Sequence, residues 1–427
     1  MTTATSEGTE PAPLVVRTVR VDDPGALLAL LPDSPGATAW IRRGEGLVGW
    51  GQAALCRTAG ASRFADASRW WSEVSRAAVV RDEVHEPGTG VVCFGSFAFA
   101  DEPGDSVLVV PEVVVGRRGS TTWLSTIGVG SIPAVPDLAP TPEPAAPRGV
   151  TFGDGALSGT AWESVVADAV RRIDEGALEK VVLARDLVAS AADAIDVRWP
   201  LARLASTYPM CWTFHVDGLF GATPEMLVRR ERGLVTSRVL AGTIRRTGDD
   251  SRDLTLAATL ARSSKDLEEH EYAVRSVADA LAPHCSSMNV PESPFVLHLP
   301  NVMHLATDVA GVTVPERAAD GASGTSLDLA AALHPSAAVG GTPTDVAVGL
   351  IREIEGMDRG RYAGPVGWMD ATGDGEWGIA LRSAEVDGSR VRLFAGCGIV
   401  AGSDPAAELA EAQAKFVPVR DSLAGQG

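Results

Sequence analysis

A run of prolines between Ser131 and Gly149 constrains the fold more than any other feature of this sequence. The segment is SIPAVPDLAPTPEPAAPRG and holds six prolines. Proline has no backbone N–H and a fixed φ, so neither a helix interior nor a central strand accommodates such a run. Residues 131–150 are therefore predicted to form a linker or a long surface crossing that separates residues 13–130 from residues 151–424.

The N-terminal residues 1–12 are rich in Thr, Glu and Pro. They lack a basic stretch followed by an apolar one, so no secretory signal is expected, and we predict a disordered tail. No run of about 18 apolar residues occurs, which argues against a membrane span. The five cysteines lie far apart and form no CxxC motif, so we expect a cytoplasmic protein with reduced thiols.

The formal net charge of the 427-residue chain is -18. Such acidity argues against nucleic-acid binding, which requires a basic surface. An anionic substrate would need a local group of cations or a bound metal to overcome repulsion by the rest of the protein.

Short β-like runs and helical patterns are mixed irregularly along the chain. Helical periodicity is clearest in residues 63–80, 161–176 and 266–281. Strands are expected from Glu179 and from Val391 to Phe394, the latter followed by a glycine turn and a final helix from Pro405. Because the elements follow no regular βαβ order, the predicted fold class is α+β.

The segment AGCGIVAGSDPAAELAEAQAK at residues 395–415 carries the strongest local signal. Gly396 and Gly398 allow the backbone to approach a ligand closely and expose N–H groups, as an anion-binding nest does. In the helix that follows, Glu408 and Glu411 share a face and Lys415 comes one turn later. Spacing alone favours a solvated helix with a surface Glu–Lys pair, and the preceding glycine turn is what favours a site.

A second acidic cluster, KDLEEHE, occupies residues 265–271. Acidic residues also suit the first turn of an exposed helix. Glu269 together with Glu411 could ligate one hard cation, because magnesium takes one or two carboxylates and keeps water or substrate oxygens as its other ligands. His270 is expected on the helix surface rather than at a metal.

Lys180 and Glu225 are candidates for proton transfer. Lys180 begins an otherwise apolar strand, and a buried lysine can have its pKa lowered and act as a base. Taken alone, a charge at a strand edge is the simpler interpretation. Glu225 follows Pro224, and a carboxyl held in a rigid turn near other carboxylates could stay protonated and donate a proton. The alternative for Glu225 is an acid in a surface turn.

Five more positions offer groups that suit a small anionic ligand. They are the hydroxyl of Thr243, the imidazole of His304, the small-residue loop around Ala338, the phenol of Tyr362 and the guanidinium of Arg382. An arginine fork matches a carboxylate through two hydrogen bonds. A histidine in an apolar context such as VMHL is more often a satisfied core residue.

Seven motifs occur in order: EKVVLAR, GATPE, LAGT, KDLEEH, HPSAAVGGTP, RYAGPVGW and GCGIVAGSDPAAELAEAQAK. Together they resemble the chorismate-utilising enzymes, which include isochorismate synthases, salicylate synthases and the synthase components for anthranilate and aminodeoxychorismate. The resemblance is dense over residues 151–420 and loose before the linker. It implies two large, mostly antiparallel sheets packed as a sandwich with helices outside, with residues 13–130 in the same unit.

The resemblance also implies a role for each candidate residue. Glu269 and Glu411 would ligate Mg²⁺, with Glu408 near the metal, and the metal would bridge to the ring carboxylate of chorismate. The enolpyruvyl carboxylate would be held by Tyr362, Arg382 and the backbone at Gly396, Cys397 and Gly398. Thr243 and Lys415 would contact the substrate or the metal shell, and His304 would line the ring. Cys397 departs from the family, which more commonly has alanine there.

Lysine at position 180 resembles the water-using branch, because ammonia-using members carry glutamine there. Lys180 would take a proton from water attacking ring C2, and Glu225 would give one to the departing C4 hydroxyl. Ala338 resembles the isochorismate synthases, since salicylate synthases usually have threonine there. The expected activity is a reversible, Mg-dependent conversion of chorismate to isochorismate by a monomer, feeding menaquinone or siderophore synthesis. The alternatives are a salicylate synthase and a non-catalytic protein that binds Mg²⁺ and a metabolite.

Overall fold

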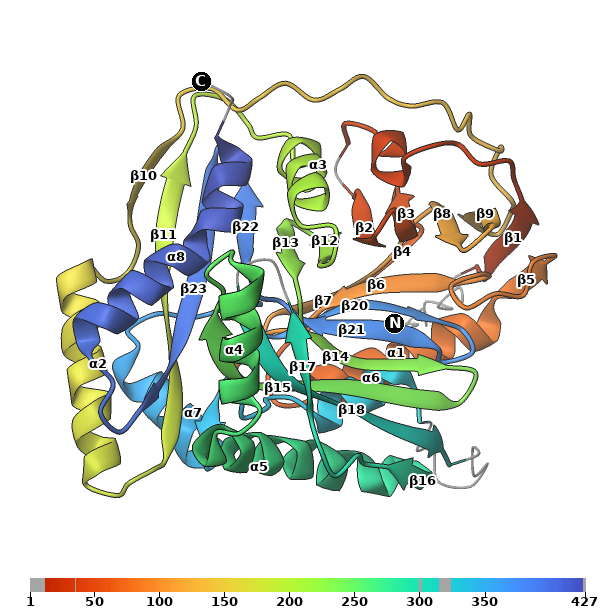
Figure 1. Cartoon of the computed structure of the whole chain (residues 1–427). Helices are drawn as coiled ribbons and strands as arrows, with labels where there is room; N and C mark the ends of the chain where they lie inside the picture. The colour runs from red at the N-terminus through yellow and green to blue at the C-terminus, as the bar shows by residue number, and fades with distance from the viewer. Residues whose placement is uncertain (1–11, 35, 299–301, 315–323, 425–427) are drawn as a thin grey trace, which may run out of the picture.

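The computed structural model describes residues 12–34, 36–298, 302–314 and 324–424, and for Thr243, Lys265 and Glu269 it describes the backbone alone. Two large sheets of 13 and 10 strands pack together, with helices around them (Figure 1). Within the described residues one strand pair, β1 with β5, is parallel and the other ladders are antiparallel. The predicted α+β sandwich is confirmed. The predicted tail, residues 1–12, lies outside the described residues except for Ala12.

The larger sheet draws strands from both halves of the chain. Its order is β10 (Thr151–Asp154), β11 (Lys180–Ser190), β23 (Arg390–Val400), β22 (Ser383–Asp387), β13 (Leu219–Thr223), β12 (Trp212–Val216), β2 (Thr38–Arg42), β3 (Glu45–Trp50), β8 (Val113–Arg118), β9 (Thr121–Val129), β1 (Leu14–Arg20) and β5 (Val79–Asp82). A short strand, β19 (Gly341–Thr342), also pairs with β11.

The smaller sheet likewise mixes the two halves. Its order is β16 (Cys285–Asn289), β18 (Val302–Thr313), β15 (Leu234–Arg245), β14 (Met226–Glu231), β21 (Gly375–Ile379), β20 (Pro365–Asp370), β6 (Val92–Ser96), β7 (Ser106–Val110) and β4 (Ala54–Thr58), with β17 (Phe295–His298) beside β18. Because both sheets interleave strands from before and after residues 131–150, the two halves share one architecture.

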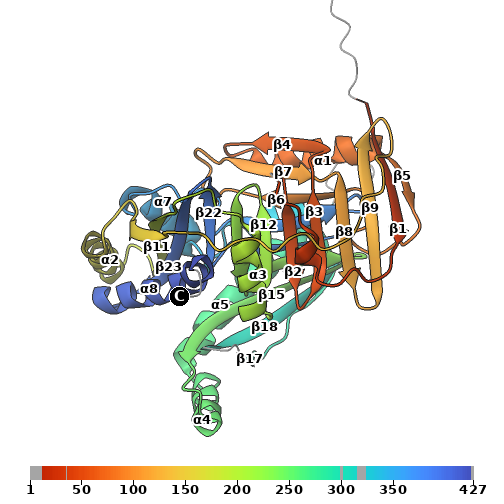
Figure 2. The same cartoon turned by 90° about the horizontal axis from the view of Figure 1, so that it is seen from above.

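Helices cover the sheets and carry several of the candidate residues. The α-helices are α1 (Arg63–Ala77), α2 (Gly159–Asp174), α3 (Arg198–Thr207), α4 (Asp250–Leu260), α5 (Ser264–Leu281), α6 (Ser326–Ala332), α7 (Thr344–Ile354) and α8 (Pro405–Leu423), with short 3-10 turns at Leu27–Leu30 and Ala282–His284. Helix α8 contacts β23, α2 and α3, whereas α5 packs on β15 and β18. Figure 2 shows α4 projecting away from the body of the molecule.

The core forms on both faces of the larger sheet. Trp40 of β2 belongs to the cluster between the sheets, and its neighbour Ile41 belongs to a second cluster that includes Phe416 of α8. Successive side chains of a strand point to opposite faces, so a strand buried on both sides must be apolar throughout. In the smaller sheet, β6 is likewise buried at all five residues, which are apolar except for Ser96.

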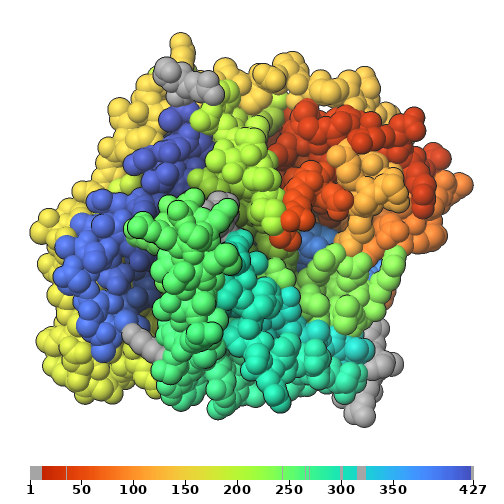
Figure 3. Space-filling model, viewed as in Figure 1, coloured from red at the N-terminus to blue at the C-terminus, as the bar shows by residue number. Residues whose placement is uncertain are grey.

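The proline-rich segment crosses the surface in an extended form, over the top of the view in Figure 1. Its described residues form no helix or strand between positions 131 and 150. Thr141 fixes it to the N-terminal half, because its N–H donates to Ala29 O over 2.8 Å and its hydroxyl donates to Leu31 O over 2.8 Å. Figure 3 shows the N-terminal segments and the C-terminal helix at opposite sides of one face.

The predicted glycine turn after Phe394 is wrong. Strand β23 continues to Val400 and pairs with β11 along its whole length, so that Gly396 lies opposite Ala184 and Gly398 opposite Val182. A glycine pair suggests a turn when only local preference is considered, but a long antiparallel ladder overrides that preference. On its other edge β23 pairs with β22 only as far as Leu393.

Candidate functional site

Electrostatic contacts join residues that are far apart in the sequence into one group, which we call the central cluster. It consists of Lys180, Glu225, His304, Tyr362, Arg382, Cys397, Glu408, Glu411 and Lys415. The charge of Arg382 acts on Glu225, His304 and Glu411, and that of Lys415 acts on the same three groups. Nine of the fourteen predicted site residues therefore meet at one place.

The Lys180 side chain lies over Gly398, which is two residues along β23 from Val400, the register partner of Lys180. A Cβ atom at position 398 would lie 3.0 Å from Lys180 Cε and 3.8 Å from its Nζ. Glycine at this position therefore leaves room for the lysine side chain to cross the strand. Lys180 is partly buried and pairs in register with Thr342 and Val400, so an exposed edge-strand charge does not describe it.

Glu225 lies in the short connection between β13 and β14 and is partly buried. Burial raises the pKa of this carboxyl, although the nearby charges of Arg382, Lys415 and Lys180 act to lower it. The direction of the shift favours the protonated acid that a proton donor requires.

Arg382 stands between β21 and β22 with a φ of 49°, in the left-handed region that a non-glycine residue rarely adopts. Such a backbone conformation is costly, and it tends to persist where function requires it. Among the described residues, none makes a hydrogen bond or ion pair with its guanidinium. A partly buried arginine in this state is available to an anionic ligand.

Glu408 and Glu411 lie one turn apart on α8, and a ligand atom from each lies within 4.8 Å of the other and of Cys397 Sγ. Burial raises the pKa of Glu408, and the charge of Glu411 adds to the effect. Burial would also raise the pKa of Glu411, but Lys415, Arg245 and Arg382 outweigh it, so this pKa is lowered. Two converging carboxylates of this kind suit a hard divalent cation.

Lys415 ties α8 to the free edge of β23. Its Nζ lies 2.7 Å from Glu411 Oε1, donates to Gly396 O over 2.8 Å and lies 3.8 Å from Cys397 Sγ. Burial raises the pKa of the Cys397 thiol to about 12, with Lys415 opposing the shift. The Glu411–Lys415 pair predicted from spacing therefore exists, but it lies against a strand instead of in open solvent.

Tyr362 lies beside Gly396 at one side of the central cluster. Its ring stacks on Phe394 with centroids 5.1 Å apart, and a Cβ at position 396 would lie 3.2 Å from its hydroxyl. Burial raises the pKa of the phenol, so it stays protonated and can donate a hydrogen bond. The backbone N–H and C=O groups of Ala184 and the C=O group of Val182 bond on the edge of β11 that faces away from β23. In an antiparallel ladder, the N–H and C=O groups of their register partners Gly396 and Gly398 therefore point away from β11.

His304 and Thr243 are register partners on β18 and β15. Burial lowers the pKa of His304, opposed by a backbone hydrogen bond at Gly242, so the imidazole is neutral at pH 7. The side chains of Thr243 and Glu269 lie outside the described residues, and their roles stay predictions. His270 is buried instead of exposed, with Nε2 2.7 Å from Thr307 Oγ1, because α5 turns this face onto β18.

Ala338 is an exposed residue of the loop that joins α6 to β19. The end of this loop pairs with the start of β11, as Gly341 lies opposite Val181 and Thr342 opposite Lys180. Only glycine fits at position 341, because a Cβ there would lie 2.2 Å from Lys180 O. The loop is thus fixed beside Lys180, although no contact places the Ala338 side chain itself in the central cluster.

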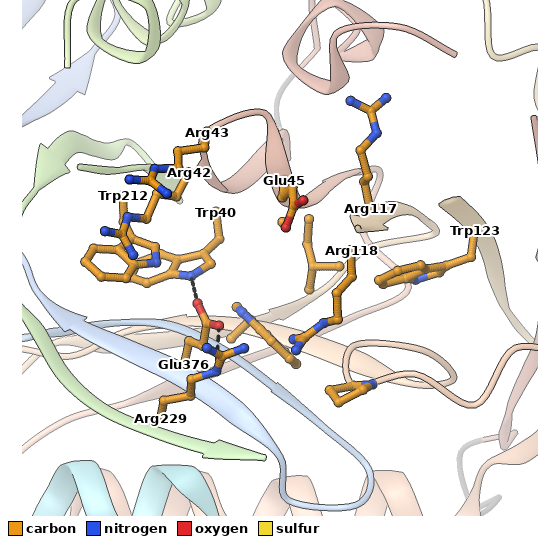
Figure 4. A pocket seen from close by; sticks show the side chains of 14 residues that line it. Trp40, Arg42, Arg43, Glu45, Arg117, Arg118, Trp123, Trp212, Arg229 and Glu376 are labelled. Atoms are coloured by element: carbon orange, nitrogen blue, oxygen red, sulfur yellow. Dashed lines mark hydrogen bonds and ion pairs between the residues drawn. The ribbon is translucent and has the colours of Figure 1, made fainter. Parts of the chain in front are cut away.

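A hollow of about 320 Å³ lies elsewhere, between β2, β8 and β12 of the larger sheet and β14, β20 and β21 of the smaller one. We call it the arginine–tryptophan pocket after Arg42, Arg43, Arg117, Arg118, Arg229, Trp40, Trp123, Trp212 and Trp368 (Figure 4). Trp40 Nε1 donates to Glu376 Oε2 over 2.8 Å, and the Arg42 guanidinium lies 4.0 Å from the Trp212 ring centroid. Within the described part of the chain, no predicted site residue lines it.

Sequence inspection missed three residues that support the cluster. Ser403 donates to Glu408 Oε1 over 2.9 Å, and Arg245 lowers the pKa of Glu411. Gly242 forms a bulge in β15 with a φ of 70°. Only the small-residue motif LAGT signalled the bulge, whereas Ser403 and Arg245 had no distinguishing local pattern.

Lysine is scarce in this chain, and its three occurrences are Lys180, Lys265 and Lys415. Each falls in one of the site motifs, and two of them belong to the central cluster. An ammonium is a compact point charge that can lose its proton, whereas arginine stays charged.

Comparison with known proteins agrees with this geometry. The family model described as chorismate binding enzyme matches residues 10–130 and 139–424. Isochorismate synthase DhbC of Bacillus subtilis (strain 168) is 41% identical over 266 residues, covering 60% of this chain and 65% of that protein. Isochorismate synthase MenF of the same organism is 36% identical over 269 residues, covering 62% and 56%. In both relatives the matched region is less than two thirds of the protein.

A solved structure extends the likeness to almost the whole chain. MenF, the menaquinone-specific isochorismate synthase from Escherichia coli, superposes with a TM-score of 0.77 at 25% identity, over 98% of this chain and 97% of that one. Because the family model covers both halves on either side of the proline-rich segment, the chain belongs to the chorismate-binding enzyme family.

Proposed function

We propose that this protein is an isochorismate synthase, an isomerase that reversibly moves the hydroxyl of chorismate from ring C4 to ring C2. The observation that carries the proposal is the environment of Glu225, a carboxyl with a raised pKa that is surrounded by Lys180, Lys415 and Arg382. A proton donor and a candidate base therefore flank one site. The matches to proteins named isochorismate synthases support the same reaction.

Magnesium is the proposed cofactor, since the donor set fits it. Glu408 and Glu411 supply converging carboxylate oxygens, and hard cations prefer oxygen ligands. Glu269, carried by α5, is proposed as a third ligand. When bound, the ion would neutralise substrate carboxylate charge and orient the ring, while the Cys397 thiol, a soft donor, is not expected to bind it.

The residues of the chain divide the remaining work. Lys180 is proposed to remove a proton from the water that attacks C2, and Glu225 to protonate the hydroxyl that leaves C4. Arg382, the Tyr362 hydroxyl and the backbone at Gly396 and Gly398 are proposed to hold the enolpyruvyl carboxylate. Thr243, His304 and Lys415 complete the proposed substrate-contacting set.

The decisive experiment is a product analysis. Purified protein is incubated with chorismate, with and without Mg²⁺, and the products are separated by chromatography. Isochorismate that forms only with the metal supports the proposal. Salicylate with pyruvate would move the protein to the lyase branch, and unchanged chorismate under all conditions would leave a binding protein.

Three accompanying properties are proposals as well. A monomer acting on a small molecule fits an active site that one chain completes. The five free cysteines fit a reducing, cytoplasmic setting. A role in menaquinone synthesis is proposed from the likeness to the menaquinone-specific enzyme, and a role in siderophore synthesis from the family resemblance alone. No helix in the described part of the chain is long and apolar enough to cross a membrane.

A further inference from the structure

Strand β11 carries Lys180 at its first position and has an incomplete neighbour on one edge. On that edge β19 pairs with Lys180 and Val181, and β10 pairs with residues 187–190. Among the described strands none covers residues 182–186 between these two. Buried backbone N–H and C=O groups need partners, so the gap requires another source of hydrogen bonds.

Side chains supply most of the missing partners. Val182 N–H donates to Gly340 O over 2.8 Å, and Arg359 Nη2 donates to Val182 O over 2.7 Å. Ala184 N–H donates to Glu355 Oε2 over 2.8 Å, and Trp162 Nε1 donates to Ala184 O over 3.0 Å. Arg359 and Glu355 thus take the place of a neighbouring strand at Val182 and Ala184, which lie two and four residues after Lys180.

Arg359 and Glu355 form a buried unit of their own. Their side chains are 2% and 0% exposed, and Arg359 Nη2 lies 2.6 Å from Glu355 Oε2. Arg359 Nε also donates to Glu355 Oε1 over 2.7 Å, and Nη1 donates to Val339 O over 3.0 Å. The guanidinium lies 4.2 Å from the Phe99 ring centroid, which closes it off on that side.

The contact with Val339 extends the unit to a second part of the site. Val339 follows Ala338 in the loop whose end pairs with Lys180. One guanidinium therefore bonds to the strand that carries Lys180 and to the loop that carries Ala338. Because its planar fork has fixed donor directions, it sets the spacing between the two segments in a way that lysine cannot reproduce.

We propose that Arg359, held by Glu355, is a positioning residue that fixes Lys180 against the Ala338 loop. The inference rests on the proposed function, in which Lys180 acts on the attacking water. Among the described residues of the central cluster, Arg359 interacts only with Tyr362, through its charge. Its loss is expected to misplace Lys180 while the metal-binding and carboxylate-binding groups stay where they are.

The test compares Arg359→Lys with Arg361→Lys. Arg361 is a matched control, since it is also largely buried and donates to Glu385 Oε1, Val216 O and Asp217 O, but does not contact β11. For Arg359→Lys with Mg²⁺ and chorismate, kcat is expected to fall on the order of 10²-fold, as for a misplacement of about 1 Å, with KM unchanged. Arg361→Lys should keep the wild-type kcat.

A second readout does not depend on turnover. The three lysines lie in separate sequence regions, so mass spectrometry can follow the acetylation rate of each in the full chain. In Arg359→Lys the rate at Lys180 should change severalfold while that at Lys415 stays constant. If Arg359→Lys does not fold, the double variant Arg359→Met with Glu355→Met removes both buried charges together and loses the bonds of both side chains to Val182 and Ala184 of β11.

Equal effects of Arg359→Lys and Arg361→Lys on kcat would overturn the proposal, as would a loss confined to KM. Parallel changes at Lys180 and Lys415 would also overturn it, because they indicate general loosening of the fold. A wild-type protein that converts no chorismate would refute the proposed function alone, since the acetylation rates still report whether Arg359 positions Lys180.

Discussion

The central cluster and the arginine–tryptophan pocket both gather positive charge, but they use it differently. In the pocket, Arg229 lies 3.2 Å from Glu376 (Figure 4), and Arg118 lies 2.8 Å from Glu231. In the cluster, the Arg382 guanidinium pairs with no carboxylate among the described residues. The pocket arginines Arg118 and Arg229 are thus already paired within the protein, whereas the charge of Arg382 is available to a ligand.

The kind of cation also separates the two regions. The pocket is lined by arginines that stack on indole rings or pair with carboxylates, and such contacts close the space between two sheets. The cluster holds two of the three lysines of the chain. Under the proposed function, in which Lys180 acts as the base, proton transfer belongs to the cluster, whereas the pocket arginines bind side chains of the protein itself.

The largest expected effect tests that assignment directly. Lys180→Ala should lower kcat for isochorismate formation by on the order of 10³-fold, within the range for loss of a general base. Chorismate binding, measured by calorimetry, should remain, because Lys180 is not among the groups that hold the carboxylates. Full turnover by Lys180→Ala would contradict the proposed mechanism.

Breaking a fully buried ion pair should cost far more stability than breaking one at the pocket. Glu355→Gln leaves Arg359 buried without its counter-charge, so the free energy of unfolding should fall by about 3–5 kcal/mol. Glu231→Gln, at a pair whose side chains are 30% and 27% exposed, should lower it by about 0–1 kcal/mol. Urea unfolding measures both, and similar losses would remove this distinction between the regions.

Arg382→Gln should weaken chorismate binding by about 2 kcal/mol, or roughly 30-fold in Kd, because one charge-assisted contact is lost. Arg118→Gln serves as the control from the pocket and should leave Kd unchanged. Calorimetric titration of both variants in Mg²⁺ gives the comparison. If Arg118→Gln raises Kd more than Arg382→Gln does, chorismate binds in the arginine–tryptophan pocket and not in the central cluster.

The pH dependence set by Glu225 separates folding stability from activity. Burial raises the pKa of this carboxyl above its ordinary value of 4.5, so the folded protein holds the proton more tightly than the unfolded chain does. Folding stability is therefore lost as pH rises from the unfolded pKa through the folded pKa. Glu225→Gln has no such loss and should show a higher Tm than wild type at pH 8, with no difference below pH 4.

The same shift predicts a matching loss of activity. Because Glu225 must be protonated to donate, kcat should fall on the alkaline side as pH passes its raised pKa. Glu225→Gln should be more stable yet about 10²-fold slower, since an amide cannot give up a proton in its place. A Tm of the variant that is lower than wild type at pH 8 would contradict the assignment.

Local pattern was sufficient for features that depend on near neighbours. The helical period in residues 161–176 predicted α2, and the proline run predicted the extended crossing. Local pattern failed where a residue distant in the sequence decides the structure of a segment. Gly396 and Gly398 lie in a strand because β11 pairs with them, and His270 is buried because β18 faces it. Neither partner is near in sequence.

The sequence by itself determined which chemical groups are available. Seven ordered motifs carried the family resemblance and gave the candidate site residues, Lys180 and Glu225 among them. The tertiary structure alone decided which groups meet, which carboxyl has its pKa raised by burial, and that Arg359 and Glu355 complete the edge of β11. The physical reason is that burial and electrostatic contact depend on distance in space, and a sheet of 13 strands brings together residues more than 200 positions apart.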